Sequence, residues 1–573
     1  MFSFSLHLAS VAYVGIGFFV SYVRSHFYTV PQDQHLPANI HIVEITIVLS
    51  YRLLHHPLSR YPGPFLAKLT DGYAGFYAAR RRLDLVTRED HQKYGSVMRH
   101  GPNKLIFNSV TALRDIYLSG RVIKADQCPV SQVAPNVFDL FYATNANLFR
   151  TKRRALGEAL SRISIFMVEP IVLEHADIFI KQLMILFRPP MSLTPLDVTA
   201  VNIMERSKRL SFDILWDLFP RCTPPLNLQT DQRNRVIINN IVLGNYRQSY
   251  KKQFPFIHQA HLYKAIGRSI CPVWAGFTGL LKAMYATCFG QPRDAQPKFY
   301  SEIADYMANG LEEDGAKLAS FWTRFLFFLI SAGDTTAAAI SSAFIHLARN
   351  PECYRKLAEE IRGTFKNSSE LRSGETLSSC PYLLAVIKET LRMSPPVSGT
   401  LWRQLDPEQE DDPLIVDGHS VPKGVLVGVN IYSLNHNKKY FPDPFKFSPE
   451  RWLPADTNTL ECLAAHQIIE DAFCPFSIGP RSCAAQGLVY LQIQLVLAKV
   501  LWHFDFKESL GKPGNGSESG KERPEDSQLY NTFTSLHDGP YLKFRPRHDL
   551  EESRKCYRGC CCRERPDSLD SGE

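Results

Sequence analysis

The chain has 573 residues and a formal net charge of +8, and its 45% hydrophobic and 21% charged residues allow a large globular core. The basic excess forms no block, which argues against nucleic-acid binding. Most of the 13 cysteines stand singly, without the spacing of a disulfide scaffold or a zinc site, and this is typical of an intracellular protein.

The N-terminus carries a candidate membrane anchor. The apolar run at residues 6–23 has marginal spanning length and is closed by Arg24. It has neither a preceding positive charge nor a cleavage site, so we predict an uncleaved single-pass anchor. The second apolar stretch, residues 40–54, contains His41 and Glu44 and is predicted to be interfacial. Basic residues after the first run place the main body in the cytosol, with the endoplasmic reticulum as the expected membrane.

Beyond the anchor the pattern predicts one mainly α domain with a smaller β-sheet portion. A stiff proline-rich stretch at 57–64 begins it. We predict strands at 97–99, 104–107, 504–506 and 541–544, and helices at 321–349, 352–365, 381–393 and 484–503.

The chain therefore divides into three parts. Residues 1–56 form the membrane anchor and interfacial segment, residues 57–549 form the main domain, and residues 550–573 form a Cys-rich disordered tail. Within the main domain, the Gly- and Ser-rich residues 511–528 are predicted to be a surface loop.

The strongest chemical signal is the segment 476–483, Phe-Ser-Ile-Gly-Pro-Arg-Ser-Cys, followed at once by a helical pattern. Cys483 thus stands at a helix N-terminus, two residues after Arg481. Helix amides and positive charge stabilise a thiolate, so we predict a lowered thiol pKa. No second ligand lies at metal spacing, so the metal must come in a cofactor with its own ligands, as haem does. The alternative is a buried core cysteine.

Phe476, Gly479, Arg481 and Cys483 match, in order and spacing, the haem-binding signature Phe-x-x-Gly-x-Arg-x-Cys-x-Gly of the cytochrome P450 family. The resemblance implies a cytochrome P450-like fold. It also implies that Cys483 is the axial ligand of haem iron, that Phe476 packs beside the sulfur, and that Arg481 pairs with a haem propionate. Ala485 stands where the family usually has the last glycine.

Two further segments resemble the same family. Glu389 and Arg392 match its Glu-x-x-Arg helix motif, and Arg451 matches its later Pro-Glu-Arg segment. The first two lie on one helix face, and Arg451 can reach the same carboxylate, so we predict a buried structural network that fixes the cysteine loop. The same spacing at 359–362 is predicted to be a solvated pair. By resemblance, Arg403 lies near a propionate.

The helix predicted at 321–349 holds Ser331-Ala-Gly-Asp-Thr-Thr, which departs by one place from the family pattern of small residue, Gly, any, acid, Thr, Thr. Thr335 can bond back to the carbonyl of Ser331, which bends the helix and opens a groove. Asp334 and Thr335 are predicted catalytic residues that hold water and deliver protons for oxygen–oxygen cleavage. The alternative is a local cap beside a tolerated threonine.

An early helix departs from the family. Its pattern of Trp or His, three residues, then Arg, donates to a propionate, whereas this chain has Phe149 and Arg153. Phenylalanine cannot donate, so we predict that one propionate contact is missing or comes from Arg153. The alternative is that Arg153 is a solvated helix charge.

These features predict a haem-dependent monooxygenase that inserts one atom of O2 into an apolar organic substrate. No flavin or dinucleotide segment follows the haem region, so electrons are expected from a separate NADPH–haemoprotein reductase on the membrane. By family analogy, the pocket is lined by Phe325, Phe328, Ala332, Thr335 and residues 397–400.

The sequence segment at residues 56–65 is similar to that of filamentous-fungal members of the family. This favours a tailoring step in terpenoid or polyketide secondary metabolism over hydroxylation of small aromatic acids such as benzoate. Two other hypotheses remain, a haem rearrangement catalyst that needs no reductase and a non-catalytic, membrane-tethered haem-binding protein.

Overall fold

The computed structural model describes most of the chain between residues 38 and 547. The described stretches are 38–125, 143–162, 165–185, 200–218, 226–232, 328–409, 412–454, 460–509 and 541–547, with parts of 530–539 and the single residues Leu140 and Arg235. The predicted anchor at 6–23, the loop at 511–528, the tail at 550–573 and residues 321–327 of the long predicted helix lie outside the described residues.

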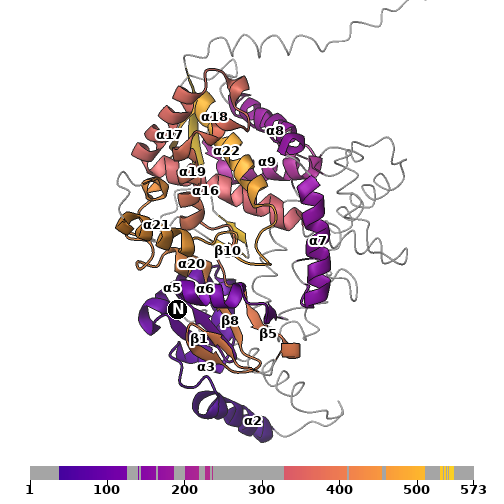
Figure 1. The fold of residues 1–573 in the computed structure, drawn as a ribbon, viewed down its shortest axis with the longest axis vertical. Helices are drawn as coiled ribbons and strands as arrows, with labels where there is room; N and C mark the ends of the chain where they lie inside the picture. Colours follow the sequence, from indigo (N-terminus) through magenta and orange to yellow (C-terminus); the bar gives the residue numbers. More distant parts are fainter. Residues whose placement is uncertain are drawn as a thin grey trace, which may run out of the picture.

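A stack of helices forms the larger part of the molecule and fills the upper half of Figure 1. Its members are α8 (Ile165–Ile185), α9 (Ile203–Asp217), α16 (Thr335–Arg349), α17 (Pro351–Thr364), α18 (Glu375–Ser378), α19 (Pro381–Met393) and α22 (Gln486–His503). Every residue of α16 from Thr336 to Leu347 is buried. A helix without an exposed face has to run through the core, and α16 does so between α9, α19 and α22.

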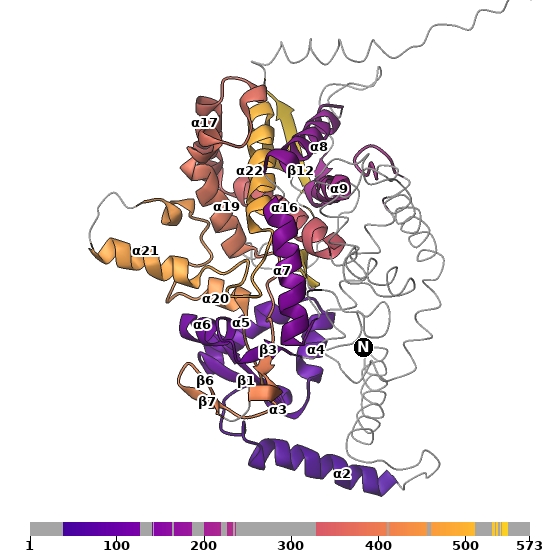
Figure 2. The same ribbon diagram turned by 45° about the vertical axis from the view of Figure 1, so that its right-hand side comes forward.

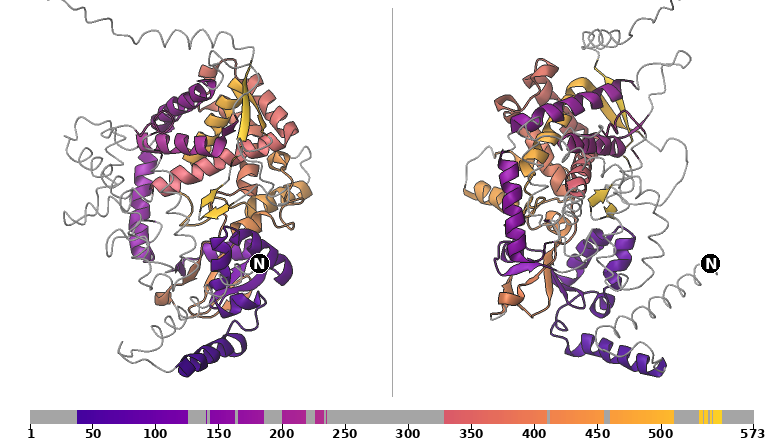
Figure 3. Two further views of the ribbon diagram at one scale, coloured as in Figure 1. Left: turned by 180° about the vertical axis from the view of Figure 1, so that it is seen from behind. Right: turned by 90° about the vertical axis from the view of Figure 1, so that its right-hand side faces the viewer.

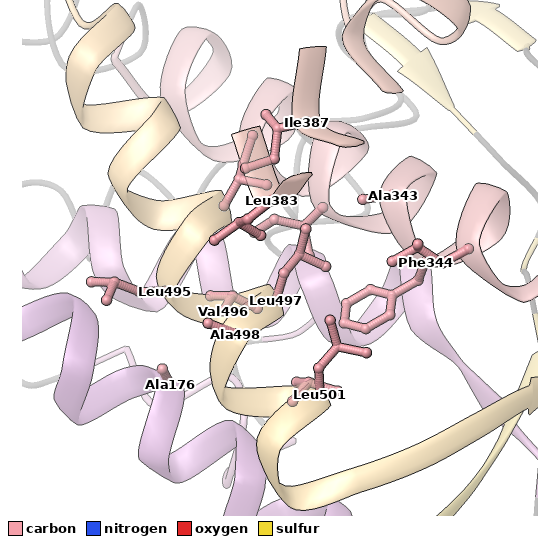
Figure 4. Packing of buried hydrophobic residues seen from close by; sticks show 14 of the residues in the cluster. Ala176, Ala343, Phe344, Leu383, Ile387, Leu495, Val496, Leu497, Ala498 and Leu501 are labelled. Carbon is pink, nitrogen blue, oxygen red and sulfur yellow. The ribbon is translucent and has the colours of Figure 1, made fainter. Parts of the chain in front are cut away.

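Apolar side chains from several helices meet in the main core. Figure 4 shows Ala176 of α8, Phe344 of α16, Leu383 of α19 and Leu497 of α22 close together, and none is more than 2% exposed. Burying one large apolar side chain contributes about 1.5–3 kcal/mol, so this cluster is a main source of stability. It fixes α16 and α22, and both candidate chemical segments lie at the N-terminal ends of these helices.

A mixed sheet occupies the other part of the molecule, in the order β1-β2-β8-β5-β3. Its strands are β1 (Val97–Gly101), β2 (Lys104–Phe107), β8 (Leu426–Val429), β5 (Arg403–Leu405) and β3 (Val122–Lys124). β2 and β8 run parallel, and the other neighbours are antiparallel. Phe107 and Val427 of the sheet share a second apolar core with Ile116. This sheet holds Arg403 at the start of β5.

Short elements surround the sheet. They are α3 (Phe65–Leu69), α4 (Gly72–Ala79), α5 (Leu83–Tyr94), α6 (Val110–Tyr117), α20 (Ile431–Asn435), the 3-10 turn Pro407–Gln409 and the hairpin of β6 (Leu414–Val416) and β7 (His419–Val421). α7 (Ala146–Arg162) runs along the molecule from the sheet towards the helical stack, as Figure 2 shows.

The remaining strands and turns belong to the helical part. β4 (Val201–Asn202), β12 (Tyr541–Pro546) and β9 (Phe504–Glu508) form a small sheet, and β10 (Tyr530–Thr532) pairs with β11 (Thr534–Leu536). α21 (Leu460–Ala472) projects to one side in Figure 2. Two 3-10 turns span Ser368–Glu370 and Pro449–Trp452.

α2 (Ala38–Ser50) continues into a π-helical turn, Tyr51–His55, at one end of the long axis in every view of Figures 1 and 3. It covers the stretch predicted to be interfacial. Within the part of the chain that is described, no helix combines the length and the apolar character that a membrane crossing requires.

The prediction of a mainly α fold with a smaller sheet is confirmed. β1 and β2 cover the predicted strands at 97–99 and 104–107, and α17 and α19 follow the predicted helices within a residue. α22 starts at Gln486, two residues later than predicted, because residues 483–485 still belong to the preceding turn.

A buried network joins α19 to the Pro449–Trp452 turn. Arg392 Nε and Nη2 donate to the two carboxylate oxygens of Glu389 at 2.8 and 2.9 Å. Arg451 Nε donates to Glu389 at 3.1 Å, and the Trp452 indole donates to it at 2.9 Å. Glu389 and Arg392 are both 0% exposed. The predicted association of these three charged residues is therefore present.

Burial alone would raise the pKa of Glu389, but the charges and hydrogen bonds of Arg392 and Arg451 outweigh it, so the pKa lies below the usual 4.5. A carboxylate with a lowered folded-state pKa stabilises the fold fully above its unfolded pKa. That contribution is lost as the pH falls below 4.5 towards the folded-state pKa. The fold should therefore lose stability on the acid side through this network.

Replacing Glu389 with alanine should lower the free energy of unfolding by about 3–5 kcal/mol, because Arg392 is then left buried without its partner. Urea denaturation followed by circular dichroism measures this loss. A loss below about 1 kcal/mol would contradict a structural role for the network.

Glu359 provides the matched control, since it heads the same Glu-x-x-Arg spacing. Its side chain is exposed and pairs with Arg355 at 2.9 Å, while Arg362 pairs with Asp505 at 2.7 Å. Glu359 and Arg362 therefore do not form the predicted solvated pair with each other, because each pairs with a different residue. Glu359→Ala should cost only about 0–1 kcal/mol.

Candidate active site

The cysteine loop closes on itself before α22 begins. The Cys483 N–H donates to the Phe476 carbonyl at 2.9 Å, and the Ser482 N–H donates to the Gly479 carbonyl at 3.0 Å. Ser477 and Gly479 both have positive φ, 58° and 77°. A Cβ on Gly479 would lie 2.2 Å from the backbone oxygen of Tyr117, so only glycine lets the loop rest on the end of α6.

The Cys483 thiol is partly enclosed by neighbouring protein atoms. The residue is exposed to solvent, although protein atoms around it raise the pKa of its thiol through burial. Cys353, Cys380 and Cys474 are buried instead, so the alternative of a core cysteine fits those residues and not Cys483.

The predicted lowering of the Cys483 pKa is wrong for the protein without a bound metal. Burial raises this pKa, and the Ala485 N–H and the charge of Arg153 oppose the rise only in part. The sequence predicted the lowering effect of backbone amides, but it named Arg481 as the positive charge where the structure has Arg153, and it did not show the enclosure by neighbouring atoms. A metal ion replaces the proton directly, so a raised thiol pKa does not prevent thiolate ligation.

Two arginines, the buried Arg403 and the half-buried Arg481, approach the same region. Burial and the nearby charge of Arg403 lower the pKa of Arg481 to about 10, and burial lowers the pKa of Arg403, which is 5% exposed. Among the residues that the structure describes, neither forms an ion pair with a carboxylate. Like charges buried together are costly, so an anionic group is expected to bind between or beside them.

α7 and the segment before it hold Arg481. The Arg481 guanidinium carbon lies 3.8 Å from the centre of the Phe149 ring, and Nη2 donates to the Ala143 carbonyl at 2.8 Å. Arg153, one turn further along α7, is half-buried and close enough for its charge to act on Cys483. The alternative that Arg153 is a fully solvated charge on the helix is therefore not supported.

Tyr117 is a site residue that carries no sequence motif. Its ring lies under Arg403, 4.9 Å from the guanidinium carbon, and its hydroxyl donates to the Leu401 carbonyl at 2.9 Å. The same hydroxyl accepts from the Val429 N–H at 3.2 Å. Tyr117 looks like an ordinary apolar position of α6 in the sequence, and only the chain's fold brings it to both Arg403 and Gly479.

The long helix is widened where the predicted groove lies. Residues Leu329–Asp334 form a π-helical segment before α16, and the Thr335 hydroxyl donates to the Ser331 carbonyl. This bond was predicted and is present. A Cβ on Gly333 would come within 2.8 Å of Phe212, so glycine lets α9 pack against this segment.

One face of this segment remains accessible within the otherwise buried helix. Phe328, Ser331, Ala332 and Thr335 are half-buried, at helical spacing, whereas Asp334 is 0% exposed. The predicted pocket residues Phe328, Ala332 and Thr335 therefore share a face. Asp334 does not belong to it.

A buried carboxylate holds the other predicted pocket segment, residues 397–400. Asp84 of α5 accepts hydrogen bonds from the Ser398 hydroxyl and, at 3.0 Å, from the Asn430 side-chain amide. Ser398 also contacts the Ser535 hydroxyl at 3.2 Å. With Ser398 buried in this way, its neighbours Val397 and Thr400 stay half-buried.

These residues suit a flat anionic cofactor whose metal takes a thiolate. The solvent-exposed Cys483 stands in the turn just before α22. The buried Arg403 and the half-buried Arg481 lack carboxylate partners among the described residues. No group of three or more His, Cys, Asp or Glu in the described residues is placed to bind a metal ion by itself. The site thus has the features of a thiolate-ligated metallocofactor centre.

Comparison with known proteins names the family. The family model described as Cytochrome P450 matches residues 62–521, and the chain belongs to the cytochrome P450 family of haem-thiolate enzymes.

Curated relatives match nearly the whole chain. Cytochrome P450 monooxygenase apf7 of Gibberella fujikuroi is 30% identical over 527 residues, which cover 88% of this chain and 97% of the relative. Cytochrome P450 monooxygenase AKT7 of Alternaria alternata is 30% identical over 87% of this chain and 95% of its own length. Fusicoccadiene 8-ol C-16-hydroxylase of Phomopsis amygdali is 29% identical over 82% and 87%. The chain is accordingly a haem-dependent monooxygenase related to filamentous-fungal enzymes.

Proposed function

We propose that Cys483 supplies the axial thiolate of a haem that catalyses hydroxylation of an apolar secondary metabolite. The observation that carries this proposal is the solvent-exposed Cys483 in a region with two enclosed arginines, the buried Arg403 and the half-buried Arg481. Bound haem supplies the activation of O2, and the protein supplies the ligand, the proton path and the substrate pose.

The arginines are proposed to bind the haem propionates. Arg403 and Arg481 offer guanidinium donors in fixed positions, and guanidinium–carboxylate hydrogen bonds are both strong and directional. Arg153 contributes positive charge near Cys483. Phe476, whose carbonyl accepts the Cys483 N–H, fixes the direction of the ligand side chain from the other end of the loop.

Thr335 is proposed to hold the water that delivers protons to the reacting oxygen. The Thr335 hydroxyl donates its hydrogen bond to the Ser331 carbonyl, so the hydroxyl oxygen can still accept a hydrogen bond from water on the accessible face. Asp334 is buried behind that face and is proposed as a proton donor that acts through Thr335 or through water. A rearrangement catalyst would have no need of this arrangement.

The substrate is proposed to be apolar. The half-buried positions 328, 331, 332, 335, 397, 399 and 400 carry Phe, Ser, Ala, Thr, Val, Gly and Thr, and none is basic. A benzoate-like carboxylate would lack a cationic partner among them, which disfavours the aromatic-acid alternative. The fusicoccadiene relative hydroxylates a diene that already carries a hydroxyl, and a comparable tailoring step on a terpenoid or polyketide fits this lining.

The electron donor is proposed to be an NADPH–haemoprotein reductase on the same membrane. Family membership implies O2, an organic substrate and a redox partner. An NADPH–haemoprotein reductase is proposed because no flavin or dinucleotide segment follows the haem region, and its location at the endoplasmic reticulum is proposed from the anchor predicted at residues 6–23.

Changing Cys483 to alanine should abolish the reduced carbon-monoxide difference band that marks thiolate-ligated haem, because no other sulfur in the loop can replace it. Cys474→Ala is the control, since that thiol is 1% exposed and lies in the core. The control should keep the band. A Cys483→Ala protein that retains the thiolate band would refute the assignment.

Changing Thr335 to alanine should lower product formed per NADPH oxidised by about 10²-fold, at the lower end of what positioned proton transfer contributes, while haem content stays unchanged. Thr335→Ser keeps the hydroxyl and should restore most of the coupling. Reconstitution with a reductase and an apolar test substrate, with product measured by mass spectrometry, decides the result. Equal coupling in all three proteins would remove Thr335 from the proton path.

The α2 end of the molecule is proposed to lie in the membrane interface. Ile42, Ile47 and Leu54 are 62%, 62% and 70% exposed, and Phe65 of neighbouring α3 is 62% exposed. Apolar side chains so gathered at one end of the molecule suit an interfacial position below the predicted anchor.

Cysteines introduced at Ile42 or Ile47 should resist a membrane-impermeant thiol reagent when the full chain is bound to phosphatidylcholine–phosphatidylserine vesicles, and should react without vesicles. Leu463→Cys on α21 is the control, because Leu463 is 55% exposed away from α2 and should react in both states. Peptide mass spectrometry reads each site separately. Equal reaction at all sites with vesicles present would exclude an interfacial α2.

A further inference from the structure

We propose that Phe149 is a positioning residue for haem retention, which replaces the family's missing hydrogen-bond donor by holding the Arg481 guanidinium against its ring. The inference rests on the proposed function of Arg481 as a propionate ligand. It assigns a role to the position at which this chain departs from the family, where the sequence predicts that a propionate contact is missing or comes from Arg153.

The geometry is that of a cation–π contact. The guanidinium carbon of Arg481 lies 3.8 Å from the Phe149 ring centre, well inside the range of about 6 Å over which such contacts are attractive. Phe149 is 8% exposed, and its N–H donates to the Asn145 carbonyl at 3.0 Å in the first turn of α7. The ring is therefore fixed by the helix start and screened from water, which strengthens the contact.

The same short segment makes a second contact with the Arg481 guanidinium. Arg481 Nη2 donates to the Ala143 carbonyl at 2.8 Å. The residues from Ala143 to Phe149 thus contribute a ring for the face of the guanidinium and a carbonyl for its edge. One segment of chain orients a side chain that belongs to the cysteine loop, far away in sequence.

Arg481 needs this hold because its surroundings are unfavourable to a cation. It is half-buried near the positive charge of Arg403, and no carboxylate in the described residues forms an ion pair with it. An acidic partner would neutralise the guanidinium and occupy the donors that a propionate needs. An aromatic face attracts the cation while leaving its N–H groups available.

The presence of Phe149 in place of Trp or His then changes how the haem propionate is bound and does not simply remove a contact. A Trp or His donor would give one hydrogen bond directly to the propionate. Phe149 gives none, but it orients Arg481, whose guanidinium carries five N–H donors in a rigid plane. One of these five N–H groups, on Nη2, already donates to the Ala143 carbonyl.

The test is a double-mutant cycle read out as the rate of haem transfer to excess apomyoglobin. Phe149→Leu keeps an apolar side chain but removes the ring, and it should accelerate haem loss by about threefold to thirtyfold, as expected for a partly to fully desolvated cation–π contact. Arg481→Lys keeps the charge but loses the planar stack, and it should accelerate haem loss at least as much. The double variant should lose haem no faster than Arg481→Lys alone.

Phe344→Leu is the matched control, because it makes the same change in the main core, where Phe344 is 0% exposed. It should lower the unfolding free energy without changing the haem-transfer rate. Phe149→Tyr keeps an aromatic face and should transfer haem at the wild-type rate.

Additive effects in the cycle, or an unchanged transfer rate in Phe149→Leu, would overturn the role of Phe149. Either result leaves the proposed function intact if the wild-type protein shows the thiolate carbon-monoxide band. A wild type that binds haem without that band would instead overturn the proposed ligation by Cys483.

Discussion

The account depends on unbalanced positive charge held beside one accessible thiol. Arg392 is a fully buried arginine elsewhere in this fold, and it pairs with the Glu389 carboxylate of α19, which it shares with Arg451. Arg403 and Arg481 are also enclosed, yet none of the described carboxylates pairs with them. Arg99, which is 0% exposed, is satisfied by the backbone carbonyls of Arg52 and Pro102. The charges of Arg403 and Arg481 repel each other, and an anion bound beside them would relieve that repulsion. The propionates of haem are anions of the required charge, and Cys483 offers the metal its ligand.

The fold holds these positive charges in place because the site residues belong to elements that are fixed by other packing contacts. The main helical core fixes α22 behind Cys483, and the mixed sheet fixes β5 with Arg403. Tyr117 connects the two, since its ring lies under Arg403 and its backbone oxygen abuts Gly479. The Glu389 network holds the turn that precedes the cysteine loop. The chemistry is thus positioned by contacts that need no cofactor to form.

Sequence reasoning predicted what is local. The hydrogen bond from Thr335 to Ser331 and the pairing of Glu389 with Arg392 follow from helix periodicity. The contact of Arg451 with Glu389 joins distant segments, and the resemblance to the family's Pro-Glu-Arg segment predicts it. Sequence reasoning failed where distant segments meet without such a motif. The enclosure that raises the Cys483 pKa, the burial of Asp334 and the stacking of Phe149 on Arg481 each require tertiary packing that no single motif encodes.

The central claim is that the sulfur of Cys483 binds iron, and X-ray absorption at the iron edge of the purified full-length protein tests it most directly. The account predicts one sulfur atom beside porphyrin nitrogens in the first coordination shell, and its disappearance when Cys483 is replaced by histidine. An iron shell made of nitrogen and oxygen alone in the wild-type protein would contradict the account.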